Sequence, residues 1–393
     1  MTQTHPHLHT ARAILNRLIA FNTTSRNSNL ELIDHVEAML TAAGARCQRI
    51  VSPDGAKANL HAFIGPDIDG GVVLSGHTDV VPVDGQNWTS APFDMIERDN
   101  RLYGRGTCDM KGFIACALAF APAFASAFAA GSLKRPIHFA LSYDEEVGCL
   151  GAPAMITSIM KQSPKPAIVF VGEPTNMKVV TAHKGLFSMR VCVEGQAGHS
   201  SLVNDGACAV THAVPMMQYL VDAAANMKAA APEDSPFDPP YGTLTIGRVQ
   251  GGVAANILAA EASFDTLVRP APWDDTDALE TGLRDLAGRI ETDMKPGAPR
   301  ASITIDTRSD VPAFSREPDG AAERLARQLT GDNATHVVSY GTEAGQFQHA
   351  GLSVVVCGPG SISQAHQPDE FIEIDQMDQC CVFMERLVAH LER

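Results

Sequence analysis

The chain has 393 residues. A single hydrophobic core rarely serves a chain of this length, so we expect two domains. Charged residues make up 19% of it and hydrophobic residues 45%, which is typical of soluble globular proteins and not of disordered ones. The formal net charge of −15 is spread along the chain. This distribution argues against nucleic-acid binding and favours a soluble protein or a small cationic partner.

The nine cysteines include no C-x-x-C pair, which argues against a zinc ribbon or a disulfide framework. We expect reduced thiols in a cytoplasmic protein. The first ten residues are polar and histidine-rich, without the apolar stretch of a secretory signal. Phe113–Ala130 is uncharged and long enough to span a membrane, but it is mostly alanine and contains Pro122. We therefore expect a buried helix there.

Helical periodicity and short apolar runs alternate in the first part of the chain. Leu8–Ala20 and Asn29–Ala43 are expected helices, and Gly44 follows the second as a C-cap. The expected strands, with helical segments between the later ones, are Ala58–Ile64, Gly71–Ser75, Ile137–Ser142 and Ala167–Val171. This alternation predicts an α/β domain with a mostly parallel central sheet, whose ligands gather beyond the carboxyl ends of the strands.

From about residue 182 the order becomes strand–helix–strand–strand–helix–strand, which predicts a ferredoxin-like α+β unit. Its expected elements are Leu186–Val193, Gly206–Ala225, a proline-rich loop over Glu233–Tyr241, Leu244–Gln250, Glu261–Val268, Thr276–Met294 and Ser302–Thr307. The main sheet then resumes with Leu352–Cys357. We interpret residues 182–312 as a domain inserted into a catalytic domain of residues 1–181 and 313–393.

Potential metal ligands follow the predicted strands of the catalytic domain. They are His77, Asp109, the pair Glu145-Glu146, Glu173 and His366. Two imidazoles and several carboxylates suit a pair of borderline divalent cations such as Zn²⁺ or Co²⁺. We expect Asp109 to bridge the two cations, with Glu146 and Glu173 each completing one of them.

Two acidic residues are left for other roles in this site. Glu145 stands beside Glu146 and can take a proton from the attacking water, as a general base. Asp79 lies two residues after His77, on the same side of the strand, so its carboxylate can accept a hydrogen bond from the imidazole.

Each of these residues alone has an ordinary alternative. His77 and Asp79 could be a surface pair, Glu145-Glu146 a solvated turn, and Asp109 the cap of a helix starting near Lys111. Their occurrence at successive strand ends is what favours a dinuclear metal site.

The inserted domain contributes a second group of polar residues. Gly198-His199-Ser200-Ser201 follows a predicted strand and opens a predicted helix, where backbone NH groups and His199 suit an oxyanion, although Ser200 could be only an N-cap. Asn256 lies in a glycine-rich turn. Arg269 ends a strand and could hold a substrate carboxylate, or form a surface salt bridge.

Together these motifs resemble the family of dinuclear zinc deacylases and peptidases related to acetylornithine deacetylase, succinyl-diaminopimelate desuccinylase and glutamate carboxypeptidases. The resemblance runs nearly end to end. It covers Gly-His-Thr-Asp-Val-Val-Pro, Gly-Arg-Gly-Thr-Cys-Asp-Met-Lys-Gly, Asp-Glu-Glu-Val-Gly, Gly-Glu-Pro-Thr and Gly-His-Ser-Ser. The segments around Gly341 and Gly360, and Gln364–Glu370, resemble the acetylornithine deacetylases most closely.

The resemblance implies several further properties. The inserted domain is expected to form a homodimer, with His199 reaching the partner's active site, and a cis peptide is expected after Asp109. Asn256 and Arg269 would handle the substrate carboxylate, and Gly341 and Gly360 would line the substrate site. Apart from the resemblance, the negative charge of Glu343 near the pocket would suit a substrate that ends in an ammonium group; alternatively, Glu343 only structures its loop.

The function that this implies is metal-dependent hydrolysis of N2-acetyl-L-ornithine to acetate and L-ornithine, for arginine biosynthesis. One alternative is a sister enzyme, namely a desuccinylase, an aminoacylase or a carboxypeptidase with the same metal core. The other is a non-catalytic binding protein of the same fold.

Overall fold

The computed structural model describes residues 4–162 and 164–393. The chain folds into two compact units. The main unit comprises the chain up to Ala182, Ser315–His336 and Thr342–Arg393. The inserted unit comprises His183–Phe314 and Val337–Gly341. Each unit is described below by itself.

The main unit is built on an eight-stranded sheet with the order β1-β2-β6-β3-β7-β14-β8-β13. Its four central strands, β6, β3, β7 and β14, run parallel, and the flanking β1, β2 and β8 pair antiparallel. The strands are β1 Arg46–Val51, β2 Ala58–Ile64, β3 Gly71–His77, β6 Ile137–Ser142, β7 Pro166–Pro174, β8 Val180–His183, β13 His336–Val338 and β14 Ser353–Gly358. A small antiparallel sheet contains β4 Ile96–Arg98, β5 Arg101–Tyr103 and β15 Phe371–Glu373.

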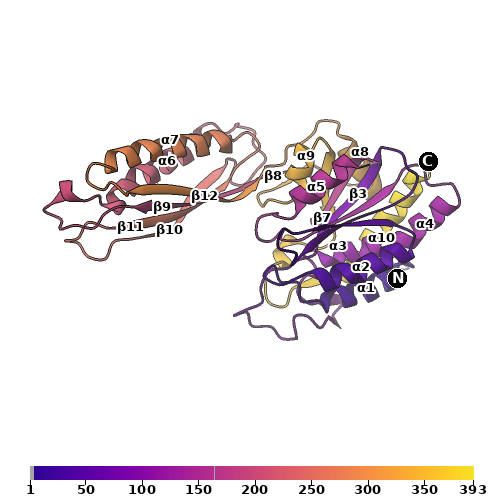
Figure 1. Cartoon of the computed structure of the whole chain (residues 1–393). Helices are drawn as coiled ribbons and strands as arrows, with labels where there is room; N and C mark the ends of the chain where they lie inside the picture. Colours follow the sequence, from indigo (N-terminus) through magenta and orange to yellow (C-terminus); the bar gives the residue numbers. More distant parts are fainter. Residues whose placement is uncertain (1–3, 163) are drawn as a thin grey trace. The chain divides into compact units, whose positions relative to one another are not determined.

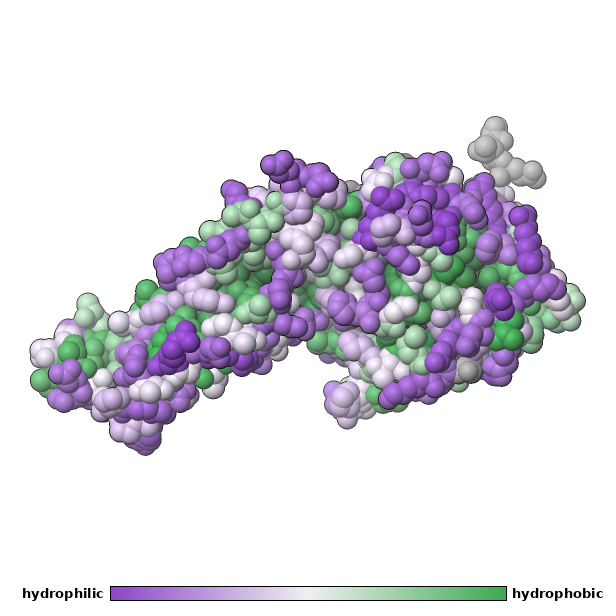
Figure 2. Space-filling view, turned by 90° about the horizontal axis from the view of Figure 1, so that it is seen from above, coloured by the Kyte–Doolittle hydropathy of each residue, from purple (hydrophilic) through white to green (hydrophobic). Residues whose placement is uncertain are grey.

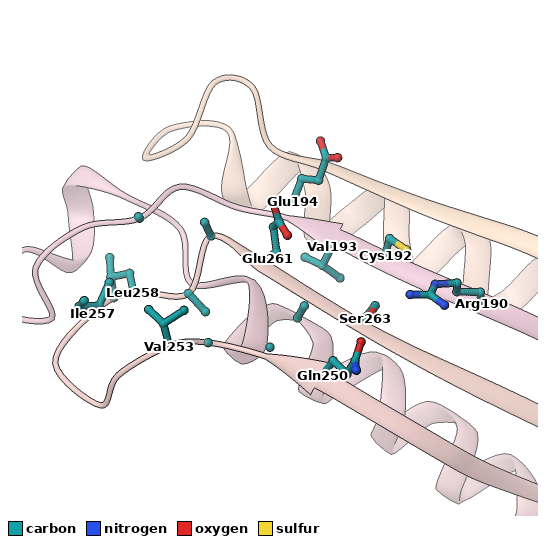
Figure 3. Close-up of a pocket in the computed structure, with 16 residues that line it drawn as sticks. Arg190, Cys192, Val193, Glu194, Gln250, Val253, Ile257, Leu258, Glu261 and Ser263 are labelled. Atoms are coloured by element: carbon teal, nitrogen blue, oxygen red, sulfur yellow. The ribbon is translucent and has the colours of Figure 1, made fainter.

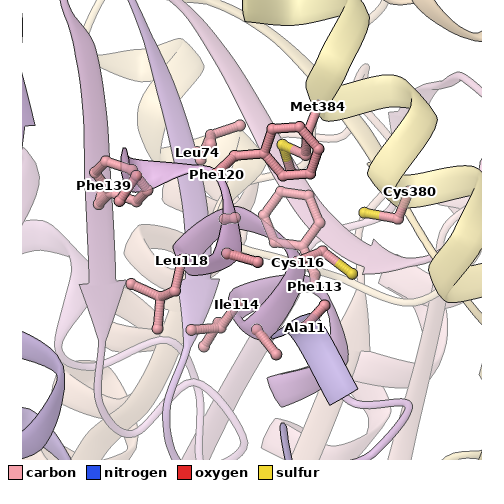
Figure 4. Packing of buried hydrophobic residues seen from close by; sticks show 14 of the residues in the cluster. Ala11, Leu74, Phe113, Ile114, Cys116, Leu118, Phe120, Phe139, Cys380 and Met384 are labelled. Carbon is pink, nitrogen blue, oxygen red and sulfur yellow. The ribbon is translucent and has the colours of Figure 1, made fainter. Parts of the chain in front are cut away.

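Helices cover both faces of this sheet (Figure 1), which gives the predicted α/β architecture. They are α1 Leu8–Ile19, α2 Leu30–Ala42, α3 Lys111–Ala119, α4 Ala121–Ala129, α5 Ala152–Lys161, α8 Ala321–Thr330, α9 Ala344–His349 and α10 Ile374–Leu391. Every residue of α3 is buried. Figure 4 shows why: Phe113, Ile114 and Cys116 of α3 meet Leu74 of the sheet and Met384 of α10 in one apolar cluster.

The apolar segment after Asp109 forms the expected buried helix, but it breaks at Phe120 into α3 and α4. Pro122 lies in the first turn of α4, where a proline ring is tolerated. Lys111–Ala129 is the one segment among residues 4–162 and 164–393 that is long and apolar enough to cross a membrane, and 67% of it is buried within the fold. It therefore has the character of a core helix.

The inserted unit has the predicted ferredoxin-like order, with an antiparallel sheet β10-β11-β9-β12. Its elements are β9 Leu186–Glu194, α6 Ala209–Ala229, β10 Thr243–Gly251, β11 Glu261–Arg269, α7 Thr276–Met294 and β12 Ser302–Val311. Alternate residues of β9 are buried, and they pack with residues of α6 and α7 in a separate core. Both helices lie on one face of the sheet (Figure 1).

Two details of these elements differ from the sequence-based expectation. The helix expected from Gly206 begins at Ala209, because Gly206 has an extended backbone. β3 and β7 run further than expected, so that His77 and Glu173 lie within the last residues of their strands. Hydrophilic residues cover much of the visible surface of both units (Figure 2), in keeping with the charge of the chain.

Candidate metal centre

Close packing between α3 and the central strands brings three predicted ligands together. His77 and Glu173 each follow a glycine, Gly76 in β3 and Gly172 in β7. A Cβ atom on Gly172 would lie 2.0 Å from the Phe113 ring of α3, and one on Gly76 would lie 2.9 Å from Ile114. Only glycine therefore allows α3 to approach the strand ends so closely. Since α3 begins two residues after Asp109, this approach carries Asp109 to the strand ends.

The first half of the cluster is deeply buried. His77 Nε2 lies 3.0 Å from Asp109 Oδ1 and 3.7 Å from Glu173 Oε1. All three residues are buried. Asp109 is not the N-cap of α3; the N-cap is Met110, whose side chain makes no capping hydrogen bond. The peptide between Asp109 and Met110 is cis, as the family resemblance implied.

The second half uses the other oxygen of the same aspartate. His366 Nε2 lies 3.3 Å from Asp109 Oδ2 and 3.0 Å from Glu146 Oε2. The His366 side chain is 54% exposed, so the cluster opens to solvent on this side. His366 also has a φ of 63°, a strained left-handed backbone for a residue with a Cβ.

The donor set fits two divalent cations. It forms two groups, His77–Asp109–Glu173 and Asp109–Glu146–His366, and in each group the ligand atoms lie within 4.8 Å of one another. Burial, with the nearby negative charge of Asp109 adding to it, raises the pKa of Glu173 well above its usual range and that of Glu146 to about 7. Hydrogen bonds with Asp109 and Glu146 raise the pKa of His366 to about 10. Cations bound here would replace these protons as the neutralising charge.

The Asp79 carboxylate does not accept the expected hydrogen bond from the His77 ring. His77 Nδ1 lies 2.8 Å from the backbone carbonyl of Asp79, whereas the nearest carboxylate oxygen is 3.7 Å away. The carboxylate instead accepts hydrogen bonds from the backbone NH groups of Glu145 and Glu146, at 3.1 and 3.3 Å, and from the Ser25 hydroxyl. Asp79 thus orients the ring with its backbone and the Glu145-Glu146 segment with its side chain.

Glu145 lies beside the cluster in a tight turn. The backbone NH of Cys149 donates to the Glu145 carbonyl, and the Cys149 thiol lies 3.3 Å from Glu145 Oε1. Burial raises the pKa of Glu145 well above its usual range, with His77 opposing this and Glu146 adding to it. A carboxyl group in such surroundings can hold a proton at neutral pH.

Two further predicted residues of this region are buried. The Glu343 side chain is closed off from solvent and lies 3.3 Å from the Ser75 hydroxyl of β3. Gly360 has a φ of 84°, and a Cβ there would lie 2.6 Å from the Cys108 sulfur. Gly360 therefore allows its loop to pack against the residue before Asp109.

The inserted unit carries the other predicted substrate residues. His199 and Asn256 are exposed, and Arg269 and Gly341 are partly buried. The helix expected to begin near His199 is absent from the described residues 198–202. His199 instead forms a β-bridge with Ile257, and the Ser200 NH donates to the Asn256 carbonyl. The helix-terminus argument for His199 was therefore wrong, whereas the bridge brings His199 next to the Asn256 turn.

A pocket of about 670 Å³ also lies in the inserted unit, between the ends of β10 and β11 and the β9 strand (Figure 3). Its lining includes Arg190, Gln250, Val253, Ile257 and Glu261. No predicted metal ligand lines it, so its size does not mark it as the reactive site.

Sequence reasoning missed the partners that hold these ligands in place. The sequence pattern singled out neither Glu370 nor Cys149 nor Arg105. The buried charges of Arg105 and Glu370 pair with each other at 2.7 Å. Their separation of 265 residues leaves no periodic signal in the chain.

The sequence profile of Peptidase family M20/M25/M40 matches residues 73–390. The chain belongs to this family. It is 37% identical over 395 residues to an acetylornithine deacetylase of Myxococcus xanthus, covering 99% of each chain. It is also 33% identical over 367 residues to an acetylornithine deacetylase of Photorhabdus laumondii, covering 92% of this chain and 91% of that protein. The chain is therefore a hydrolase of a metal-dependent peptidase family.

Solved structures confirm the M20 fold. An M20 metallo-carboxypeptidase of Sulfolobus solfataricus aligns over 99% of both chains, with a TM-score of 0.75 and 16% identity. A dinuclear metal-binding peptidase of the M20 family from Bacillus subtilis aligns over 98% of this chain and 99% of that one, with a TM-score of 0.66 and 16% identity. At these identities the likeness extends to the fold alone.

Proposed function

We propose that this M20 hydrolase removes the acetyl group from N2-acetyl-L-ornithine, releasing acetate and L-ornithine for arginine biosynthesis in the cytoplasm. The observation that carries the reaction class is the position of Asp109, whose two carboxylate oxygens each face a different histidine. The choice of substrate rests on the relatives named acetylornithine deacetylase, which the chain matches along nearly its whole length.

In this proposal His77, Asp109 and Glu173 would hold one Zn²⁺ or Co²⁺ ion, and Asp109, Glu146 and His366 would hold another. Ions bound there would supply Lewis-acid polarisation of the acyl carbonyl and would lower the pKa of the attacking water. Glu145 accepts the proton of that water and passes it to the leaving amine. The Asp79 carboxylate keeps Glu145 in place by accepting a hydrogen bond from the backbone NH of Glu145, and the Cys149 thiol contacts the Glu145 carboxylate.

The inserted unit supplies the groups that recognise the substrate. In the homodimer that the family resemblance implies, His199 would reach the active site of the partner subunit and donate to the developing oxyanion, and Asn256 and Arg269 would bind the α-carboxylate of the amino acid. Gly341 and Gly360 leave room for the substrate backbone, and Glu343 structures its loop.

The discriminating experiment is a panel of N-acylated amino acids assayed with added Zn²⁺ or Co²⁺. The proposal requires acetylornithine to have the highest kcat/KM of the panel, above succinyl-diaminopimelate and above uncharged N-acetyl amino acids. A higher value for a succinylated substrate or for a dipeptide would assign the chain to a sister activity. No turnover of any member would leave only a binding role.

A further inference from the structure

A single buried carboxylate organises the loop that carries Asp109. Glu370 Oε1 accepts hydrogen bonds from the backbone NH groups of Cys108 and Asp109, at 2.9 and 3.0 Å. Its Oε2 accepts from the backbone NH of Gly106 at 3.0 Å and from Arg105 Nη1 at 2.7 Å. Both oxygens are therefore fully used, and the loop of residues 105–109 is wrapped around them.

The same network reaches the backbone of His366. Arg105 Nη2 donates to Gln86 Oε1 at 2.6 Å, and Gln86 Nε2 donates to the His366 carbonyl at 2.9 Å. Glu370 follows His366 by only four residues, so the contacts form a closed ring through both ligand loops. The strained backbone of His366 is thus held by a specific hydrogen bond.

Burial makes a purely stabilising role a poor explanation for this ring. The side chains of Arg105 and Glu370 are each only 1% exposed. Removing such a charged pair from water costs several kcal/mol per ion, so well-packed apolar side chains often stabilise a fold as well or better. The guanidinium group of arginine, however, presents several hydrogen-bond donors in a fixed planar geometry. Bonds to such a group restrict the orientation of a loop more than apolar packing does.

We propose that Glu370, Arg105 and Gln86 are positioning residues that hold Asp109 and His366 in the arrangement that two cations require. Glu370 fixes the aspartate that serves both cation positions, whereas Gln86 fixes only the histidine of one. The inference rests on the proposed metal centre, and it predicts different effects for the two residues.

The test is cobalt binding to the metal-stripped full-length chain, measured by calorimetry and by the visible absorption of bound Co²⁺. Gln86→Ala should weaken one of two cation sites by about 10–100-fold and leave the other unchanged. Glu370→Gln should weaken both, because Asp109 serves both. Gln162→Ala is the matched control, because its amide bonds only to Gln48 and Ser158 among the described residues.

The His366→Ala variant identifies which of the two cation sites Gln86→Ala weakens. His366→Ala should lose the same site that Gln86→Ala weakens, so adding Gln86→Ala to His366→Ala should not change the remaining site. Unchanged affinities in Gln86→Ala, or an equal loss at both sites, would overturn the proposal. If Glu370→Gln does not fold, Gln86→Ala decides alone. Failure to hydrolyse acylated amino acids would overturn the proposed function but not this result.

Discussion

Glu145 shows how a single side chain can differ in role from an identical neighbour. Glu146 contacts His366, whereas Glu145 contacts the Cys149 thiol and leaves its carboxylate outside both ligand groups. Glu145→Gln keeps the shape of the side chain but cannot accept a proton. We expect kcat to fall by about 10²–10⁴-fold while the chain still binds two cations. Steady-state kinetics with metal analysis of the same sample checks this, and turnover near that of the wild type would refute the role.

Residue types also explain which parts of the site the sequence could predict. His77, Glu146 and Glu173 were predictable because they lie at or just after the end of a short apolar strand, which is a local signal, whereas Asp109 was recognised from its motif. The role of the Asp79 carboxylate was not predictable. The i, i+2 pattern places Asp79 beside His77 but cannot show that its backbone carbonyl lies nearer to the ring than its carboxylate does. The ring of Gln86, Arg105 and Glu370 was missed because its members are paired only by the fold.

Among the elements, α3 determines the geometry of the site through its packing on β3 and β7. Gly172→Ala would place a methyl group 2.0 Å from the Phe113 ring, so the ring or the strand would have to move. We expect a loss of about 1–3 kcal/mol of unfolding free energy, with weaker cation binding because Glu173 is displaced. Gly288→Ala in α7 is the control, since a Cβ there would meet no atom of the described residues within 4 Å. A melting temperature of Gly172→Ala equal to that of the wild type would contradict this account.

The pairing of β2 with β6 buries two histidines that make folding sensitive to acid. His61 Nε2 and His138 Nδ1 lie 3.0 Å apart, and burial lowers their pKa values to about 4 and about 3. An unfolded histidine titrates near 6.5, so the neutral pair stabilises the fold above that pH. This stabilisation is lost as the pH falls from 6.5 towards 4, by up to about 1.4 kcal/mol per unit for each histidine.

Urea unfolding of the metal-stripped chain at several pH values measures this loss. The double variant His61→Phe/His138→Phe should show a shallower decline below pH 6.5 than the wild type. His9→Gln, at an exposed position of α1, should follow the wild-type curve. Parallel curves for the double variant and the wild type would mean that other groups cause the acid sensitivity.

At the scale of the whole molecule, the alternation of strands and helices was predictable for much of the chain, whereas β1, α8, α9 and α10 were not predicted. The alternation of strands and helices, and the change near residue 182, predicted both units. Short strands such as β4, β5, β13 and β15 were not predicted, because three residues are too few to show a period. Near His199, the serines that resembled a helix start belong to a loop fixed by the bridge to Ile257.

The family resemblance further predicts a homodimer through the inserted unit. β10 is an edge strand of its sheet, and Val210, Val214 and Val221 are exposed on α6, which packs on β10. An exposed strand edge beside apolar side chains suits pairing with a second copy. Val214→Asp should lower the molar mass measured by light scattering from two chains towards one. Val51→Asp, on the edge strand of the main unit, should not, and an unchanged mass for Val214→Asp would argue against this interface.

The most direct test of the metal centre is anomalous diffraction from crystals of the zinc-loaded enzyme. Two peaks should lie on either side of Asp109, about 3.5–4 Å apart, one against His77 and Glu173 and the other against Glu146 and His366. A single peak, or a second peak away from His366, would contradict the sharing of Asp109 on which the proposed chemistry depends.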